Sequence, residues 1–412
     1  MIRWVAFQPL IGGMALGAEK AFGSTPLFVI DYKGVDNSKA YVNYMNDIRK
    51  SNLKHLILDG DLISKSQVFE NKEDREFFLK ECHDIDVVCA VPICSGLSFA
   101  NNCVSGKKAR GSNAIQNNNM IGITEFALSI IQPKAYIFEN APALFSKNSE
   151  SLREQLNEIA TSNGYSVTYV KTNSNLHNNV QYRQRTFAIF WNSKYCPVLN
   201  PVNNKCGTIK EFLSSIDENA PYQTSEYNVF DDFENNTYIK YIKKKYGSDY
   251  RRYWAETGYL SITNLIEGLN DFEYASEIVD EKAKEFLKHI QEKRSLGKNY
   301  FDCGPLWYGE YKVPTIFGRT INRLVHPSEE RGYNIRELLK FMGMPDDFVF
   351  DDPIKNKHFI GQNVPVDTAK DWCLQIKDFL NGKLKFSTNS VSMFDNVKQS
   401  EIACKKVNKF VF

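Results

Sequence analysis

The chain has 412 residues, of which 42% are hydrophobic and 24% are charged, and its formal net charge is +2. This composition is ordinary for a globular protein, and the length suffices for one large domain and a smaller one. We see no apolar run that could cross a bilayer and no secretory leader, so we expect a cytoplasmic protein. With so little net charge, a nucleic-acid surface would need local segregation of charge or base-specific contacts.

The nine cysteines are odd in number, irregularly spaced and without a Cys-x-x-Cys pair. This pattern argues against a disulfide framework and against a structural zinc site, and it fits a reducing compartment. The six histidines form no recognisable ligand cluster, so we predict no metal.

In the first half of the chain, short apolar runs alternate with helical stretches. We predict strands at residues 4–7, 27–30, 55–58, 87–91, 135–138 and 187–191. Helices are predicted between them, for example at residues 39–50, 121–131 and 149–162. This alternation predicts an α/β fold with a doubly wound, Rossmann-like sheet whose ligand lies at the carboxyl ends of the strands.

The character changes from about residue 201 to residue 317, where aromatic residues, asparagines and mixed charges replace the alternation. Basic and aromatic residues interleave at 240–246 and 249–254, which is typical both of a nucleic-acid surface and of a solvated amphipathic helix. A helix is predicted at 281–294. Regular structure returns with helices at 335–342 and 366–380.

A glycine-rich turn follows the first predicted strand and leads into a helix. Its residues Ile11, Gly12 and Gly13 would let the backbone approach a ligand closely, with the helix amino terminus directed at that ligand. The turn alone would equally suit a dinucleotide-binding oxidoreductase. Asp31 and Asp61 end the next two predicted strands, where an acid either contacts a cofactor or caps a turn.

Three further segments carry reactive side chains. Cys94 follows a predicted strand, the pair Glu139-Asn140 ends another, and Arg183 and Arg185 precede a third. Taken singly, such a cysteine is more often a small buried hydrophobe, a Glu-Asn pair often caps a helix, and paired arginines often form a solvated face. Together they offer a nucleophile, an acid and two cations.

The ordered set resembles the DNA (cytosine-5) methyltransferase family, with matching segments over about residues 5–380. The resemblance implies that Cys94 adds as a thiolate to carbon 6 of cytosine and that Glu139 contacts the ring at its Watson-Crick edge. Arg183 and Arg185 would polarise the carbonyl and hold the cysteine loop. Neighbouring positive charge is expected to favour the thiolate.

The resemblance also implies S-adenosyl-L-methionine as cofactor. Asp31 would bind the ribose, Tyr32 would stack on the adenine and Asp61 would accept from its amino group. The implied cofactor-binding residues are Gln8, Leu10, Ile11, Gly12, Gly13, Asp31, Tyr32, Asp61, Leu62, Ile93, Gln362, Asn363 and Val364. The implied substrate-binding residues are Ser95, Ser98, Asn140, Lys243, Lys244, Arg251 and Arg252.

Three positions depart from the family pattern. Gln8 and Leu10 fill the Phe and first Gly of its Phe-x-Gly-x-Gly turn, and Ile93 stands where proline usually precedes the nucleophile. The Gly-Asn of its carboxyl-terminal motif becomes Gly361-Gln362, with Asn363 one position later. None of these changes removes a reacting group, so we expect an active enzyme.

We therefore expect sequence-specific methylation of carbon 5 of cytosine in duplex DNA, on a base flipped out of the helix. The domains would be 1–200 (catalysis and cofactor), 201–318 (target recognition), 319–385 (a segment returning to the catalytic domain) and 386–412 (a tail). Duplex DNA is the expected partner, together with a cognate restriction endonuclease, and the chain should be a monomer. The alternatives are a transfer RNA methyltransferase, a non-catalytic DNA-binding homologue and a nicotinamide oxidoreductase.

Overall fold

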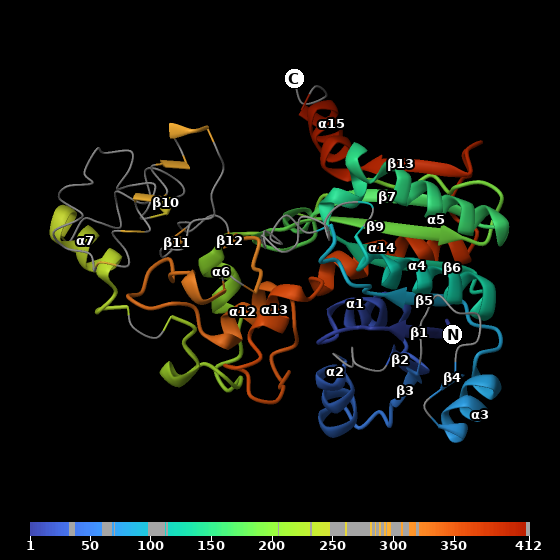
Figure 1. Cartoon of the computed structure of the whole chain (residues 1–412), viewed down its shortest axis with the longest axis horizontal. Helices are drawn as coiled ribbons and strands as arrows, with labels where there is room; N and C mark the ends of the chain where they lie inside the picture. Colours follow the sequence, from blue (N-terminus) through green and yellow to red (C-terminus); the bar gives the residue numbers. More distant parts are fainter. Residues whose placement is uncertain are drawn as a thin grey trace. The chain divides into compact units, whose positions relative to one another are not determined.

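The computed structural model of the chain forms two compact units, which are described separately (Figure 1). The first unit comprises Met1–Cys206, Phe341–Asp351 and Asn363–Phe412, and the second comprises Gly207–Lys340 and Asp352–Gln362. The residues that the structure describes are 1–32, 38–59, 68–69, 71–97, 112, 114–204, 206–230, 233–247, 260–261, 281, 285, 288–289, 292–293, 295–297, 306–307, 313–318 and 321–408.

A nine-stranded sheet in the order β13-β7-β9-β6-β5-β1-β2-β3-β4 is the centre of the first unit. The strands are β1 Trp4–Phe7, β2 Phe28–Tyr32, β3 Lys54–Asp59, β4 Val68–Phe69, β5 Val87–Ala90, β6 Ala135–Asn140, β7 Ser166–Asn173, β9 Gln184–Trp191 and β13 Val391–Asp395. Within this sheet, β4 and β9 run antiparallel to their neighbours and the other pairings are parallel. The predicted α/β fold class is confirmed, and all six predicted strands are present.

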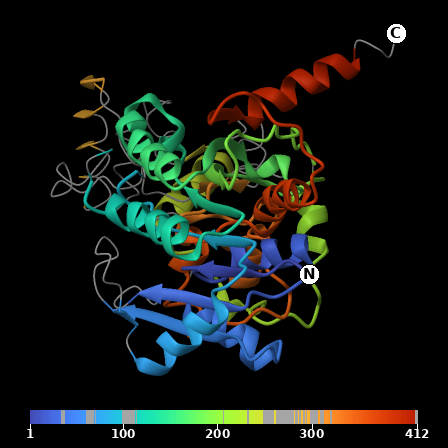
Figure 2. The same cartoon turned by 90° about the vertical axis from the view of Figure 1, so that its right-hand side faces the viewer.

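Helices cover both faces of the sheet (Figures 1 and 2). They are α1 Gly13–Phe22, α2 Lys39–Asn43, α3 Lys72–Glu81, α4 Asn117–Phe126, α5 Glu150–Ser162, α14 Val366–Leu380 and α15 Asn396–Asn408. Successive strand residues point to opposite layers. On β9, Phe187 packs on Trp372 of α14, whereas Ala188 belongs to the core cluster that includes Leu152 and Leu156 of α5.

The predicted helix boundaries hold with small changes. Helix 39–50 consists of α2 and a π-helical segment, Tyr44–Ile48, and helix 121–131 consists of α4 and a second π-helical segment, Ala127–Ile131. Residues 386–412, expected only as a tail, contribute β13 at the sheet edge and α15, which extends toward the carboxyl terminus (Figure 2).

The second unit contains α6 Ile209–Ser214, α7 Thr237–Tyr246, α13 His358–Gln362 and an antiparallel pair of short strands, β10 Leu260–Ser261 and β11 Leu306–Trp307. Helix α12, Ile335–Phe341, ends where the chain returns to the first unit. Most of the predicted helix 281–294 lies outside the described residues. In the part of the chain that is described, no helix is long and apolar enough to span a membrane.

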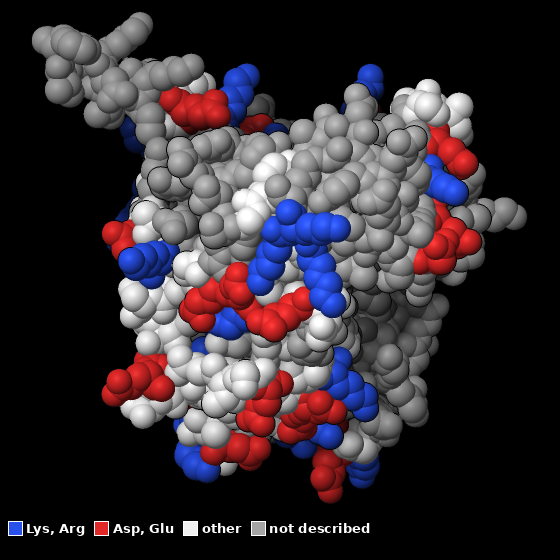
Figure 3. Space-filling model, turned by 90° about the vertical axis from the view of Figure 1, so that its left-hand side faces the viewer, with Lys and Arg blue, Asp and Glu red and all other residues white. Residues whose placement is uncertain are grey.

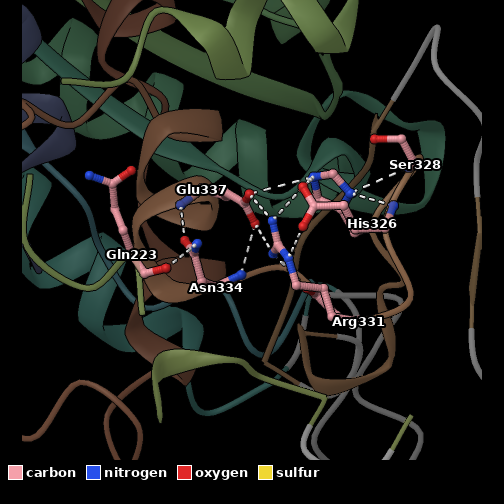
Figure 4. Close-up of polar contacts among 8 residues, drawn as sticks. Gln223, His326, Ser328, Arg331, Asn334 and Glu337 are labelled. Atoms are coloured by element: carbon pink, nitrogen blue, oxygen red, sulfur yellow. Dashed lines mark hydrogen bonds and ion pairs between the residues drawn. The ribbon is translucent and has the colours of Figure 1, made fainter. Parts of the chain in front are cut away.

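A buried ionic network anchors the start of α12 (Figure 4). Asn334 and Glu337 form reciprocal side-chain to backbone hydrogen bonds of 2.8 and 2.9 Å, which is a capping box. Arg331 donates to both carboxylate oxygens of Glu337 at 2.8 and 2.7 Å. Although burial raises the pKa of Glu337, hydrogen bonds from Arg331 and His326 lower it to about 2. The carboxylate therefore remains charged inside the unit.

Candidate active site

The predicted site residues lie at or just beyond the carboxyl ends of four neighbouring parallel strands. In the register of the sheet, Phe7 of β1 lies beside Ile30 of β2 and Ala90 of β5, and Ala90 lies beside Phe138 of β6. The segments that leave these strands therefore start at the same edge. This shared edge brings together the glycine-rich turn, the acid at the end of β2, the cysteine loop and the Glu-Asn pair.

Cys94 lies in a partly exposed turn after β5. The pairing with β1 continues one residue past β5, because the Val91 N–H donates to the Phe7 carbonyl at 3.1 Å. The turn itself is closed by a hydrogen bond of 3.1 Å from the Leu97 N–H to the Cys94 carbonyl. A Cβ on Gly96 would lie 2.7 Å from the Asn117 side-chain oxygen, so the turn packs closely on the start of α4. The thiol is thus held on a short, supported loop.

Glu139 and Arg185 form an ion pair, with the Arg185 Nε 2.7 Å from the carboxylate. Antiparallel pairing of β6 with β9 places Glu139 opposite Phe187, two residues from Arg185. The two side chains are 3% and 15% exposed, so solvent screens this pair much less than it would a surface pair. The carboxylate is oriented by the arginine.

Arg183 is 1% exposed, and its guanidinium donates to the backbone carbonyl of Asn363 at 2.8 Å. Burial and the nearby Arg185 charge lower the pKa of Arg183 to about 9, so it remains a cation at neutral pH. This contact joins residues 180 positions apart in the sequence. It fixes one catalytic candidate to the carboxyl-terminal segment.

The charges of this cluster act on one another. Burial and then the Glu139 charge raise the pKa of the Cys94 thiol, while Arg185 and Arg183 lower it without reversing the shift. Burial also raises the pKa of Glu139, against the same two arginines. The two arginines thus favour the thiolate, as expected, but burial and the Glu139 charge leave the pKa of the thiol raised overall.

The glycine-rich turn has left-handed backbone conformations, which are strained at Leu10 but not at a glycine. Leu10, at the position of the family's first glycine, has a φ of 57°, and Gly12 has a φ of 102°. A Cβ on Gly13 would lie 1.8 Å from the Val364 carbonyl oxygen. The Gly13 N–H donates to the Asn363 side chain at 2.9 Å, whereas Gln362 is exposed at the end of α13. Thus Asn363 and Val364, rather than Gln362, contact the turn.

Gln8 is 2% exposed, and within the described part of the chain its side-chain amide has no hydrogen-bond partner. A buried, unpartnered amide is costly unless a ligand or water satisfies it. The neighbouring Ile11 is buried as well. A polar cofactor bound beside the glycine-rich turn could supply the hydrogen bonds that this amide lacks among the described residues.

Asp31 and Tyr32 end β2, and both have protein partners. The Asp31 carboxylate accepts from the Ser38 hydroxyl at 3.0 Å, from the Ser38 N–H at 3.3 Å and from His55 at 2.9 Å. This set of donors fits the turn-capping role of a fully buried side chain, and a carboxylate has about four acceptor positions, so it could still accept from one more hydroxyl. The Tyr32 hydroxyl accepts from the Asn119 amide, and the same amide accepts from the Ile93 N–H at 2.8 Å.

The predicted substrate residues lie in different settings. Ser95 is partly exposed in the cysteine turn, and Asn140 is buried with its oxygen on the Ala141 N–H at 2.8 Å. On α7, Lys243 pairs with Glu330 at 2.8 Å, and Lys244 is exposed. The predictions for Asp61, Leu62, Ser98, Arg251 and Arg252 lie outside the described residues.

Charges of both signs mix on the surface of the molecule. On the face shown in Figure 3, Lys and Arg side chains gather beside Asp and Glu side chains and do not form a purely basic area.

Among the residues that the structure describes, no group of three or more His, Cys, Asp or Glu side chains is arranged to hold a metal ion.

The comparisons with known proteins agree with this geometry. A profile described as C-5 cytosine-specific DNA methylase matches residues 10–378. The chain belongs to this family. It is similar to the Type II methyltransferase M.DdeI of Desulfomicrobium norvegicum, with 21% identity over 288 residues. The aligned region covers 65% of this chain and 64% of the relative. A DNA (cytosine-5)-methyltransferase 3 of Zea mays is 30% identical over 155 residues, 35% of this chain but 15% of the relative. The chain thus spans less than two thirds of either relative.

Solved structures of methyltransferases share the fold. The chain is similar to the methyltransferase EhMeth of Entamoeba histolytica, with a TM-score of 0.55 and 13% identity over 92% of this chain and 99% of that one. A putative DNA modification methyltransferase encoded within an Escherichia coli prophage has a TM-score of 0.55 and 16% identity, over 92% of this chain and 100% of that one. At these identities the likeness establishes the fold alone.

Proposed function

We propose that this chain methylates carbon 5 of cytosine in duplex DNA, with S-adenosyl-L-methionine as methyl donor and a covalent Cys94 adduct on a flipped-out base. One observation carries the proposal. In a chain of this family, Cys94, Glu139, Arg183 and Arg185 interact electrostatically at the carboxyl edge of the sheet. These are the nucleophile, acid and cations that the reaction requires.

The charge coupling supports a sequence of proton movements. The Cys94 thiol gives its proton to the Glu139 carboxylate, and its sulfur bonds to carbon 6 of the cytosine, which moves negative charge onto the ring. Glu139, whose pKa burial raises, then passes this proton to ring nitrogen 3 and is again the carboxylate that pairs with Arg185. The ring is then an enamine with a nucleophilic carbon 5.

The second half of the reaction restores the aromatic ring. When bound, S-adenosyl-L-methionine supplies the methyl group that carbon 5 takes up. A water-derived base removes the proton from carbon 5, the Cys94 sulfur leaves as a thiolate, and nitrogen 3 returns its proton to Glu139. Arg183, held by the Asn363 carbonyl, stays fixed beside the thiol throughout.

The residues around the glycine-rich turn support the cofactor assignment. Gln8 offers an unsatisfied buried amide. Gly12 and Gly13 let the turn pack closely, because a Cβ would collide with Tyr41 at the first and with the Val364 carbonyl at the second. Ile11, Asp31, Tyr32, Ile93 and Asn363 complete the proposed binding set. Asp61, Leu62, Gln362 and Val364 remain assigned by resemblance.

Target recognition is proposed for residues 201–318, with Lys243, Lys244, Arg251 and Arg252 as DNA contacts. Residues 319–385 would return the chain to the catalytic domain. A cognate restriction endonuclease and a monomeric state are part of the same proposal. Ser95, Ser98 and Asn140 would contact the flipped cytosine or its backbone.

The test combines sequencing with trapping. Bisulfite sequencing of DNA from cells expressing the wild-type chain should show methylated cytosines in a fixed sequence context, and Cys94→Ser should abolish them. Wild-type protein should also form a denaturation-resistant complex with DNA that carries 5-fluorocytosine. Carbon 5 then carries fluorine in place of the proton that a base must remove, so the covalent adduct cannot break down. Cys82→Ser, at another free cysteine, is the matched control and should change neither result.

Two results would contradict the proposal. Undiminished methylation by Cys94→Ser would exclude this nucleophile. Methylation of transfer RNA without methylation of duplex DNA would replace the substrate.

A further inference from the structure

Three consecutive asparagines, Asn117, Asn118 and Asn119, begin α4. Asn117 and Asn119 are buried at 1% and 8% exposure, and Asn118 is exposed. Buried amide side chains are retained where they satisfy other polar groups. Both buried asparagines face the cysteine loop, since Asn117 lies against Gly96 and Asn119 bonds to Ile93.

The Asn119 amide joins two parts of the site. Its oxygen accepts from the Ile93 N–H at 2.8 Å, and its nitrogen donates to the Tyr32 hydroxyl. A backbone N–H can only donate, so the amide oxygen must face Ile93 and the NH₂ group must face Tyr32. One side chain thus holds the residue before the nucleophile and the end of β2.

Ile93 explains why this loop needs such a contact. Where the family pattern has proline, the φ angle is fixed by the ring and no N–H is present. With isoleucine, the backbone regains conformational freedom and an N–H that lies beyond the last strand pairing of β5. Asn119 satisfies that N–H and ties it to a helix.

We propose that Asn119 is a positioning residue that replaces the missing proline, holding the Cys94 loop in the geometry for attack and linking it to Tyr32 in the proposed cofactor site. The proposal rests on the proposed function, because it presumes that Cys94 is the nucleophile. Asn119 itself touches no reacting atom.

The experiment measures how fast the full chain forms the covalent complex with 5-fluorocytosine DNA in a single turnover, at saturating DNA and S-adenosyl-L-methionine. Asn119→Ala should slow this step by about tenfold or more, because a loop displaced by a fraction of an ångström misaligns the nucleophile. Asn119→Asp keeps the acceptor for Ile93, so its rate should stay within about threefold of wild type. Asn118→Ala, the exposed neighbour, is the matched control and should have the wild-type rate.

A rescue separates positioning from general stability. In an Ile93→Pro background the N–H is gone and φ is fixed again, so adding Asn119→Ala should slow adduct formation by less than about threefold. Thermal unfolding of each variant checks that it is folded at the assay temperature. If alanine unfolds the protein, Asn119→Thr, which is polar but too short to reach both partners, takes its place in both backgrounds.

The results distinguish the two proposals. A wild-type rate for Asn119→Ala, or equal slowing in the wild-type and Ile93→Pro backgrounds, would overturn the positioning role while Cys94→Ser remains inactive. Adduct formation by Cys94→Ser would instead remove the nucleophile and with it the premise of this inference.

Discussion

The Arg185 Nε lies 2.7 Å from the Glu139 carboxylate, and the same carboxylate raises the pKa of the Cys94 thiol. The proposed acid and nucleophile are therefore not independent. When Glu139 takes up a proton, the charge that opposes ionisation of Cys94 disappears. The next prediction isolates this relationship.

Glu139→Gln should increase the reactivity of Cys94 toward iodoacetamide at pH 8 in the DNA-free protein. Removing the carboxylate charge lowers the pKa of the thiol. The pH at which the alkylation rate reaches half its maximum should therefore fall. Methylation should nevertheless fall by about a hundredfold, because the proton donor is lost. Peptide mass spectrometry measures alkylation at Cys94, and Glu158→Gln on the exposed side of α5 is the control. An unshifted midpoint would show that Glu139 does not act on the thiol.

Leu10→Gly should stabilise the protein by up to about 1 kcal/mol, because a left-handed backbone is costly for a residue with a Cβ. Leu10 has a φ of 57°. Urea unfolding measures the change. Ala15→Gly, inside α1, should instead destabilise by about 1 kcal/mol. If both variants destabilise equally, the turn at Leu10 carries no strain.

Asp31→Ala should weaken S-adenosyl-L-methionine binding by about 1 to 3 kcal/mol, the cost of a lost buried hydrogen bond to a polar ligand. Turnover at saturating cofactor should suffer much less. Ser38→Ala removes one protein donor to the same carboxylate and should lower stability while leaving cofactor affinity unchanged. Calorimetry measures both affinities. Unchanged affinity in Asp31→Ala would mean that the carboxylate only caps the turn.

Glu337→Gln should reduce stability at neutral pH and lose its effect in acid. The pKa of Glu337 is about 2 in the folded protein against an ordinary value of 4.5. Its stabilisation, of the order of 3 kcal/mol, is therefore fully present above pH 4.5 and is lost as the pH falls toward 2. Denaturant unfolding measured across this pH range should show the free energies of unfolding of wild type and Glu337→Gln converging in acid. Glu329→Gln, whose side chain is 56% exposed, should change stability much less. A constant difference at all pH values would assign the effect to lost packing.

Lys244→Ala should weaken DNA binding for all sequences alike and lower the slope of log affinity against log salt by about one, as loss of one phosphate contact requires. Cofactor affinity should not change. Lys383→Ala, an exposed lysine of the first unit, is the control. Should Lys244→Ala and Lys383→Ala bind DNA with the same salt dependence as wild type, α7 is a solvated helix and recognition lies elsewhere.

The sequence predicted the central strands well because they are buried on both faces and read as continuous apolar runs, as Trp4–Phe7 does. It did not reveal β7, whose buried positions include Ser166, Thr168 and Thr172. The hydroxyls of Thr168 and Thr172 accept from Trp191 and Asn396, and such tertiary partners are invisible to a local pattern.

The candidate site was predicted from the order of its motifs, but the contacts that support it were not. Asn119 is 26 residues from Ile93 and 87 from Tyr32 along the chain, so no spacing rule connects them. The only local signal was the run of three asparagines at Asn117–Asn119, and such a run does not by itself predict a tertiary contact. The raised pKa of Cys94 was likewise missed, because it depends mainly on burial and then on the Glu139 charge, neither of which a local pattern shows.

The place of β13 in the sheet has a consequence for how the chain is made. A ribosome that has reached residue 390 has already produced β7, whose outer edge pairs only with residues 391–395 in the described sheet. Until those residues emerge, the outer edge of β7 over residues 167–171 presents unpaired backbone groups, which is a template for association with other chains. A stop codon just before Val391 should therefore give a protein whose proposed chemistry is encoded in full but which is prone to aggregate.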